Sequence, residues 1–102
     1  MKYQSLHDAK LIAVSFDWVK GVSFLQFEGD HRRWSLRAEG VKKMQFLRTF
    51  PWGRSSFVND VFGPTDLPDG LQSLQIQVQS GDTIEVNAQL FDLLSEPAAG
   101  SV

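Results

Sequence analysis

The stretch from Leu74 to Ala88 reads LQIQVQSGDTIEVNA and carries the clearest structural signal in the chain. Apolar residues alternate with glutamine up to Gln79, and after Ser80-Gly81-Asp82 a second alternating run continues to Leu90. Successive side chains of a strand point to opposite faces, so this period of two predicts strands with one buried and one hydrated face. Because glycine and aspartate suit a tight turn, the stretch predicts a β-hairpin.

The same periodicity recurs toward the N-terminus. Residues 10–18, 22–28 and 32–38 alternate between apolar and polar side chains, and glycine-containing turns separate them. Four apolar residues of the first run are expected to share one face: Ile12, Val14, Phe16 and Trp18. The second run has apolar residues on both faces, which indicates a strand covered on both sides.

Three other segments are less regular. Residues 41–50 fit either one or two helical turns or a strand, and a strand from about Met44 is favoured because a following proline suits an extended end. Residues 63–70 contain two prolines and two glycines, which predicts a surface loop. Residues 91–94 are expected to dock as a last turn, and the small residues from Ser95 to Val102 predict a mobile tail.

These segments predict one all-β domain. The chain has 102 residues, a normal length for one domain, and we expect that domain to cover residues 1–94 and the tail to cover 95–102. About seven short strands joined by tight turns predict an antiparallel β-sandwich or a curved, partly closed sheet.

Composition narrows the compartment and the class of partner. The sequence has no cysteine, no secretory signal and no apolar run long enough to span a membrane, so we expect a cytoplasmic protein that does not act in a membrane. The net charge is −2, but residues 30–54 hold seven Lys or Arg and two acidic residues. The charges could pair across the sheet or form a basic face for an acidic partner. Two observations disfavour nucleic acid as that partner. The chain is acidic overall, and the alternation places Trp34 on the inward face, where it could not stack on bases.

The stretch Pro51–Asp60 is the candidate site. Pro51 ends strand pairing and Gly53 permits a positive φ, so the stretch can be a purely structural crossover between strands. It can also be a recognition loop that combines an aromatic platform, a guanidinium group and hydrogen-bonding side chains. The binding residues predicted on that second interpretation, together with a histidine near the N-terminus, are Trp52, Arg54, Ser55, Asn59 and His7.

Catalytic and cofactor motifs are not evident in the sequence. Gly53-Arg54-Ser55 begins like a nucleophile elbow but lacks the following glycine, and only His7 and His31 could serve as a base. Two histidines and no cysteine give no recognisable metal site, and no phosphate-binding loop is present. We therefore predict a protein that is not an enzyme and that uses no cofactor or metal.

Three short motifs carry a resemblance. His7-Asp8-Ala9, Pro51-Trp52-Gly53-x-Ser55 and Gln79-Ser80-Gly81-Asp82 resemble elements of a group of small, uncharacterised bacterial all-β proteins, in an arrangement that covers most of residues 6–90. The chain is more loosely similar to small immunity proteins of bacterial toxin systems, which often have a His-Asp pair before the first strand. It departs from the group at Arg54, where proline is common. No catalytic residue comes with either resemblance.

Two functional hypotheses follow. The first is a non-enzymatic binding module with a protein partner, in one form an immunity-like inhibitor of a bacterial toxin. The alternative is a small-molecule binding protein or enzyme with a site around the Pro51–Asn59 loop. Self-association as a homodimer, through the exposed Gln-rich face or an edge strand, is a further arrangement that the sequence permits.

Overall fold

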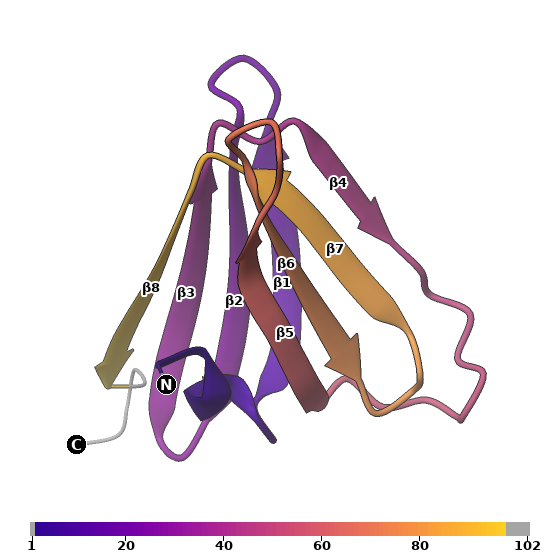
Figure 1. Ribbon diagram of the computed structural model, residues 1–102. Coiled ribbons are helices and arrows are strands. Elements are labelled where there is room, and N and C mark those ends of the chain that lie inside the picture. The colour runs from indigo at the N-terminus through magenta and orange to yellow at the C-terminus, as the bar shows by residue number, and fades with distance from the viewer. Residues whose placement is uncertain (1, 98–102) are drawn as a thin grey trace.

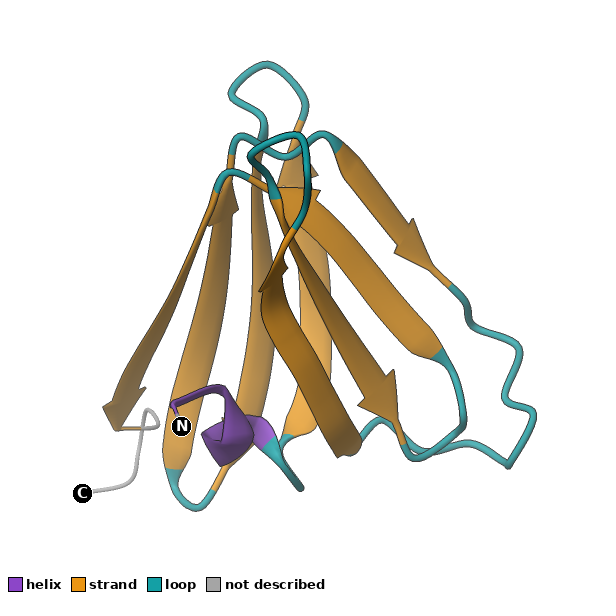
Figure 2. Ribbon diagram, in the orientation of Figure 1, coloured by secondary structure: helices purple, strands orange, loops and turns teal. Residues whose placement is uncertain are grey.

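The protein is a β-sandwich of two four-stranded antiparallel sheets (Figures 1 and 2). The computed structural model describes residues 2–97. Sheet A has the order β1-β2-β3-β8 and sheet B the order β4-β7-β6-β5. The prediction of an all-β antiparallel domain is confirmed, with eight strands in the described residues where about seven were expected. A short 3-10 helix, η1, precedes the strands. The bounds are η1 Lys2–Leu6, β1 Lys10–Asp17, β2 Val22–Gly29, β3 Arg32–Glu39, β4 Lys43–Phe46, β5 Val58–Asp66, β6 Gln72–Val78, β7 Thr83–Ala88 and β8 Leu90–Pro97.

The hairpin predicted from Leu74 to Ala88 is present as β6 and β7. Leu74 lies opposite Val86 and Ile76 opposite Ile84, so the apolar positions of both strands share the inner face. These four side chains are buried, whereas Gln75 on the other face is partly exposed. The period of two therefore predicted both the strands and the face that packs.

Both sheets and η1 contribute to one core. Leu6 of η1 is fully buried and packs with residues of the two inner faces. The Gln4 side chain donates to the carbonyl oxygen of Val61 at 3.3 Å, which attaches η1 to β5. The helix thus covers the core on the β5 side of the sandwich. The buried apolar residues besides Leu6 are Ala9, Leu25, Phe27, Leu36, Ala38, Val58, Val61, Leu74, Ile76, Val78, Ile84, Val86, Ala88 and Phe91.

The C-terminal part of the chain differs from the prediction. After β7 the chain passes from sheet B to sheet A within one residue, Gln89, and β8 pairs with β3 from Leu90 to Pro97. The expected last turn at residues 91–94 is therefore wrong. The predicted tail is wrong for Ser95–Pro97, which pair with Arg32–Trp34, while its remainder lies outside the described residues. Pairing with β3 extends these residues although they lack a clean alternation.

The middle segments are partly as expected. β4 spans Lys43–Phe46, which confirms a strand over helical turns in that region. The surface loop expected from residue 63 begins later, because β5 continues to Asp66. A cis peptide bond joins Gly63 and Pro64 inside β5, and the β5–β6 register shifts there. The irregularity explains why proline and glycine are tolerated within this edge strand.

A β-bulge changes the faces of β1. Leu11 lies opposite Phe27 but Ala13 lies opposite Gln26, so one residue is inserted at this point. As a result Leu11, Val14 and Phe16 share the inner face, and Ile12 belongs to the bulge. The expectation that Ile12 shares a face with Val14 and Phe16 is wrong, because a bulge is not visible in an uninterrupted alternation, and Trp18 lies in the turn that follows β1. The expectation that β2 is covered on both faces is also wrong, since its outer residue Gln26 is exposed.

Candidate protein-binding site

One side of the sandwich lacks the cover that η1 gives to the other. β1 is the edge strand of sheet A and β4 the edge strand of sheet B, and both have a neighbour on one side only. Figure 1 shows β4 at the edge of its sheet, at the opposite side of the molecule from β8. We call the side formed by Leu11–Val19 and Val41–Leu47 the open flank.

Inward-facing aromatic side chains remain exposed at the open flank. Phe46 lies opposite the buried Ile84, which places it on the inner face, yet 60% of its surface is exposed. Phe16 lies opposite the buried Ser23 and is 41% exposed. Both side chains point into the space between the sheets, but β4 has only four residues and, within residues 2–97, no strand continues past either edge. The core is therefore open to solvent along this side.

Two adjoining hollows form a groove along the open flank. One, of about 560 Å³, lies between Phe16 and Trp18 of the first hairpin and the segment Val41–Met44. The other, of about 360 Å³, lies between Leu11–Val14 and a wall that includes Leu47, Phe50 and Ile84. Phe46 lines both hollows, so they meet at this residue. The groove therefore follows β1 along its length, with sheet A on one side and sheet B on the other.

The β1–β2 turn extends the apolar surface at one end of the groove. Trp18 is 86% exposed and Val19 is 94% exposed. The ring of Trp18 meets that of Phe16 edge to face, with centroids 5.9 Å apart. Monomeric proteins rarely expose large contiguous apolar patches, and those that they do expose are often interaction sites.

Cations without carboxylate partners border the groove. Lys42 lines the larger hollow and Arg48 the smaller one. The guanidinium groups of Arg48 and Arg54 lie 4.7 Å and 4.8 Å from the ring centroid of Phe50, in cation–π geometry. Among residues 2–97, none of these three cations forms an ion pair. Lys43 differs from them, since its Nζ lies 2.9 Å from the carboxylate of Glu85.

The only carboxylate lining the smaller hollow is committed to the protein itself. Asp82 is buried, and its carboxylate accepts the backbone N–H groups of Thr49 at 2.8 Å and Phe50 at 2.9 Å. It also accepts the hydroxyl groups of Thr49 and Ser80. Removal of water raises the pKa of Asp82, but these hydrogen bonds outweigh that effect and lower it to about 2. Asp82 therefore stays ionised and holds the segment after β4 against the hairpin turn.

The predicted Pro51–Asp60 stretch is anchored to the same turn. The N–H of Trp52 donates to the carbonyl oxygen of Ser80 at 2.8 Å. The indole lies against Gly81, where an added Cβ would come within 2.7 Å of Trp52 Cδ2. Two of the three motifs singled out in the sequence, the one with Trp52 and the one with Gly81, therefore contact each other. Trp52 remains 66% exposed.

The third motif joins the same region through side chains. His7 Nδ1 lies 3.2 Å from the carboxylate of Asp8, which accepts a hydrogen bond from Gln79 at 3.5 Å. Gln79 in turn accepts a hydrogen bond from the hydroxyl of Ser55 at 3.5 Å. The three motifs thus form one connected surface at the end of sheet B.

Of the five residues predicted as a binding site, Ser55 is half-buried and the other four are exposed, and they are not all brought together. His7 and Ser55 are linked through Asp8 and Gln79, whereas the Asn59 amide donates to Gln77 on the outer face of sheet B at 2.8 Å. Trp52 covers Gly81, and Arg54 lies over Phe50. Of the five, Ser55 alone lines either hollow of the open flank. A role for them in binding stays a prediction.

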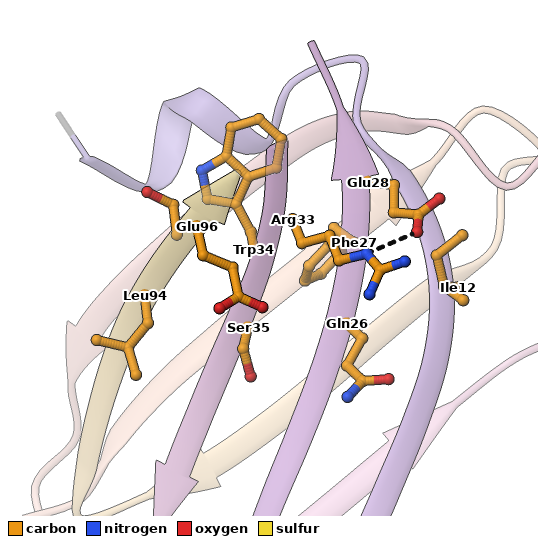
Figure 3. A pocket seen from close by; sticks show the side chains of 10 residues that line it. Ile12, Gln26, Phe27, Glu28, Arg33, Trp34, Ser35, Leu94 and Glu96 are labelled. Carbon is orange, nitrogen blue, oxygen red and sulfur yellow. Dashed lines mark ion pairs between the residues drawn. The ribbon is translucent and has the colours of Figure 1, made fainter. Parts of the chain in front are cut away.

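A different hollow lies on sheet A (Figure 3). It has a volume of about 410 Å³, and its polar residues include Gln26, Ser35, Glu28 and Arg33. Arg33 Nε lies 3.2 Å from Glu28 Oε1, so the cation here has an internal partner. This pairing distinguishes the hollow from the open flank, where the bordering cations Lys42 and Arg48 have none in the described chain.

The described residues contain neither a metal-binding cluster nor a membrane-spanning helix. Between residues 2 and 97, no three His, Asp or Glu side chains are grouped so that they could hold a metal ion. Within the same range, no helix is long and apolar enough to cross a membrane. No protein-family model and no curated protein matches the chain.

The residues of the open flank were not predicted as a site. Val14, Phe16 and Phe46 have the parity and composition of core residues, so periodicity assigns them to the interior. Their exposure depends on which strands end up at the sheet edges, and strand order is a long-range property. The apolar residue Leu47, which directly follows Phe46 at the end of β4, was the local signal that could have indicated an unusual environment.

Proposed function

We propose that the protein is a non-enzymatic binding module that recognises a protein partner through the open flank. Its β-sandwich holds the groove in place, and the groove residues Phe16, Trp18 and Phe46 supply the apolar contact. In the form that the resemblance to immunity proteins implies, the partner is a bacterial toxin and the module is its inhibitor.

The exposure of inward-facing side chains supports this proposal most directly. Phe46 is 60% exposed although its strand parity directs it toward the core. Burial of a phenylalanine side chain contributes roughly 1.5–3 kcal/mol, so leaving Phe16 and Phe46 open forgoes a large stabilisation in a domain of this size. A partner that covers the flank would recover that free energy on binding. Aromatic side chains with arginine nearby are also typical of binding hot spots.

Site-specific photo-crosslinking in the cells that make the protein tests the proposal. Benzoylphenylalanine placed at Phe16 or Phe46 is expected to give one defined crosslinked protein. The matched control is Phe62 on the outer face of β5, which is similarly exposed but lies away from the flank. The same crosslink from Phe62, or none from Phe16 and Phe46, would contradict the proposal.

Mass spectrometry of the crosslinked product then tests its inhibitory form. A toxin is expected at the flank, either an enzyme such as a nuclease or a pore-forming protein. Its activity should fall when the purified module is added. A partner whose activity is unchanged by the module would contradict the inhibitor role while leaving the binding role in place.

A further inference from the structure

We propose that the open flank takes an extended acidic segment of the partner, which pairs with β1 as an additional strand of sheet A. This inference rests on the proposed function and specifies the chemistry of the partner. The segment would place alternate apolar side chains against Phe16 and Phe46, and inward-facing carboxylates at either end of this apolar run would lie near Lys42 and Arg48.

The backbone of β1 is suited to receive a strand. Its first residues are occupied, because the Leu11 N–H donates to the carbonyl oxygen of Ser56 at 2.8 Å and Lys10 bridges to Phe57. From Ile12 to Phe16, β1 pairs with β2 on one side and with no described strand on the other. Unpaired strand edges are ready templates for another strand.

Protection of this edge is unusually weak. Natural edge strands commonly carry lysine, proline or inward-pointing charges that prevent pairing with another chain. The five residues Ile12–Phe16 include no charged residue and no proline. The bulge at Leu11–Ala13 perturbs only the beginning of the edge. The uncharged part of β1 coincides with the length of the groove, where Val14 and Phe16 face the space between the sheets.

Charge selects the kind of segment. Lys42 and Arg48 border the groove on the sheet B side and have no carboxylate partner among residues 2–97. Asp82, which also lines the groove, is saturated by four hydrogen bonds. The groove thus presents positive charge without internal compensation, which favours a segment that carries Asp or Glu.

The same charges disfavour a second copy of this chain. In a symmetric dimer built on β1, the groove of each protomer would approach the groove of the other, and equivalent surfaces would meet. Lys42 and Arg48 would then gain no carboxylate from the equivalent groove. An acidic strand from a different protein meets both the apolar and the charge requirements.

Selection from a displayed library of random peptides tests this inference on the whole chain. Peptides of about ten residues exceed the free edge of β1 and allow any register. Enriched sequences are expected to alternate apolar residues with a period of two and to contain Asp or Glu. The double variant Phe16→Ser/Phe46→Ser is expected to bind a selected peptide at least about tenfold more weakly, because apolar contact is lost.

Backbone methylation of the best selected peptide gives a readout that does not depend on any protein variant. A paired strand directs the N–H groups of alternate residues toward its neighbour. N-methylation of the set of residues whose N–H groups face β1 should therefore abolish binding. Methylation of the other set of alternate residues, whose N–H groups point away from β1, should leave binding within about threefold of the unmodified peptide. Uniform tolerance of methylation would overturn strand addition.

The remaining outcomes separate this inference from the proposed function. A selected peptide with apolar residues at a spacing of three or four, whose binding still depends on Phe16 and Phe46, would overturn strand addition but retain a partner site at the flank. Binding that does not depend on Phe16 or Phe46, or no enrichment at all, would overturn both the inference and the proposed function.

Dimers that dissociate in the double variant would assign the flank to a second copy. Sedimentation of the wild type alone with phosphatidylserine vesicles would assign it to a membrane surface, and either result overturns the inference.

Discussion

The indole of Trp52 lies directly on Gly81, and a single Cβ at Gly81 would come within 2.7 Å of it. The contact joins two segments that are far apart in sequence and fixes the path of the chain from β4 to β5. It also explains why glycine occupies the β6–β7 turn, since Gly81 has a φ of 89° as well as no space for a side chain.

Gly81→Ala is expected to destabilise the protein more than Gly70→Ala does. Both glycines have positive φ, which costs an alanine about 1–2 kcal/mol, but Gly70 has open space around it. Displacement of Trp52 and Pro51 should add about 1–3 kcal/mol at Gly81. Urea unfolding of the two variants measures the difference. Equal losses would show that the Trp52 contact does not constrain the turn.

The ionised carboxylate of Asp82 makes stability depend on pH in the acid range. Its pKa is about 2 in the folded protein against 3.8 for an unperturbed aspartate, so the folded state binds the proton less readily than the unfolded state. The resulting stabilisation is present above about pH 4 and is lost as the pH falls toward 2.

Unfolding midpoints measured across this range for the wild type and Asp82→Asn test the effect. The variant should be less stable at neutral pH, and its stability should fall less steeply between pH 4 and pH 2. Asp66→Asn is a suitable control, because Asp66 is exposed and accepts one hydrogen bond, from Gln72. A curve for Asp82→Asn parallel to that of the wild type would contradict the role of Asp82.

Phe46 is expected to contribute little to folding. Because it is 60% exposed, Phe46→Ser should change the free energy of unfolding by less than about 1 kcal/mol. Leu36→Ala, at a fully buried position of sheet A, should cost about 2–5 kcal/mol. Denaturant titration compares the two directly. A loss for Phe46→Ser as large as that for Leu36→Ala would mean that the flank is part of the folding core.

Charge at the groove should govern the salt dependence of binding. Arg48→Gln and Lys42→Gln are each expected to weaken binding of a selected acidic peptide a few-fold at low salt, and the differences should shrink near about 0.5 M NaCl. Arg32→Gln serves as the control, because Arg32 lies at the far end of β3 and donates to Ser95. Isothermal titration at two salt concentrations provides the comparison. Equal effects of all three substitutions would remove the argument for an acidic segment.

Trp52 distinguishes the open flank from the loop site predicted from sequence. Since Trp52 does not line the groove, Trp52→Ala should leave peptide affinity within about twofold. Fluorescence anisotropy with a labelled peptide measures this. A loss comparable to that of Phe46→Ser would place the binding site at the Pro51–Asn59 loop instead.

Local sequence patterns predicted the strands and turns whose formation depends only on neighbouring residues. The Leu74–Ala88 hairpin and the strand at Met44 follow from alternation and turn chemistry, both of which act over a few residues. The bulge at Ile12 left the apolar alternation intact, so sequence reasoning placed Ile12 on the wrong face. β8 was missed because Leu90–Pro97 gains its extended form from pairing with β3, which is distant in sequence.

The candidate site was harder to predict for the same reason. The residue types of Trp52 and Arg54 favour binding, and both side chains are exposed. Phe46 has the same sequence character as a core residue, and only its place on an edge strand exposes it. Edge positions follow from strand order, which no short motif in this chain encodes.

Hydrogen–deuterium exchange with and without a selected peptide tests the central proposal most directly, because it reports where on the whole chain a partner binds. The proposal predicts slower exchange of the backbone amides in Ile12–Phe16 and around Phe46, with Trp52 and Gly53, which do not line the groove, unchanged. Slower exchange confined to the Pro51–Asn59 loop, or to the outer face of sheet A around Ser35, would contradict it.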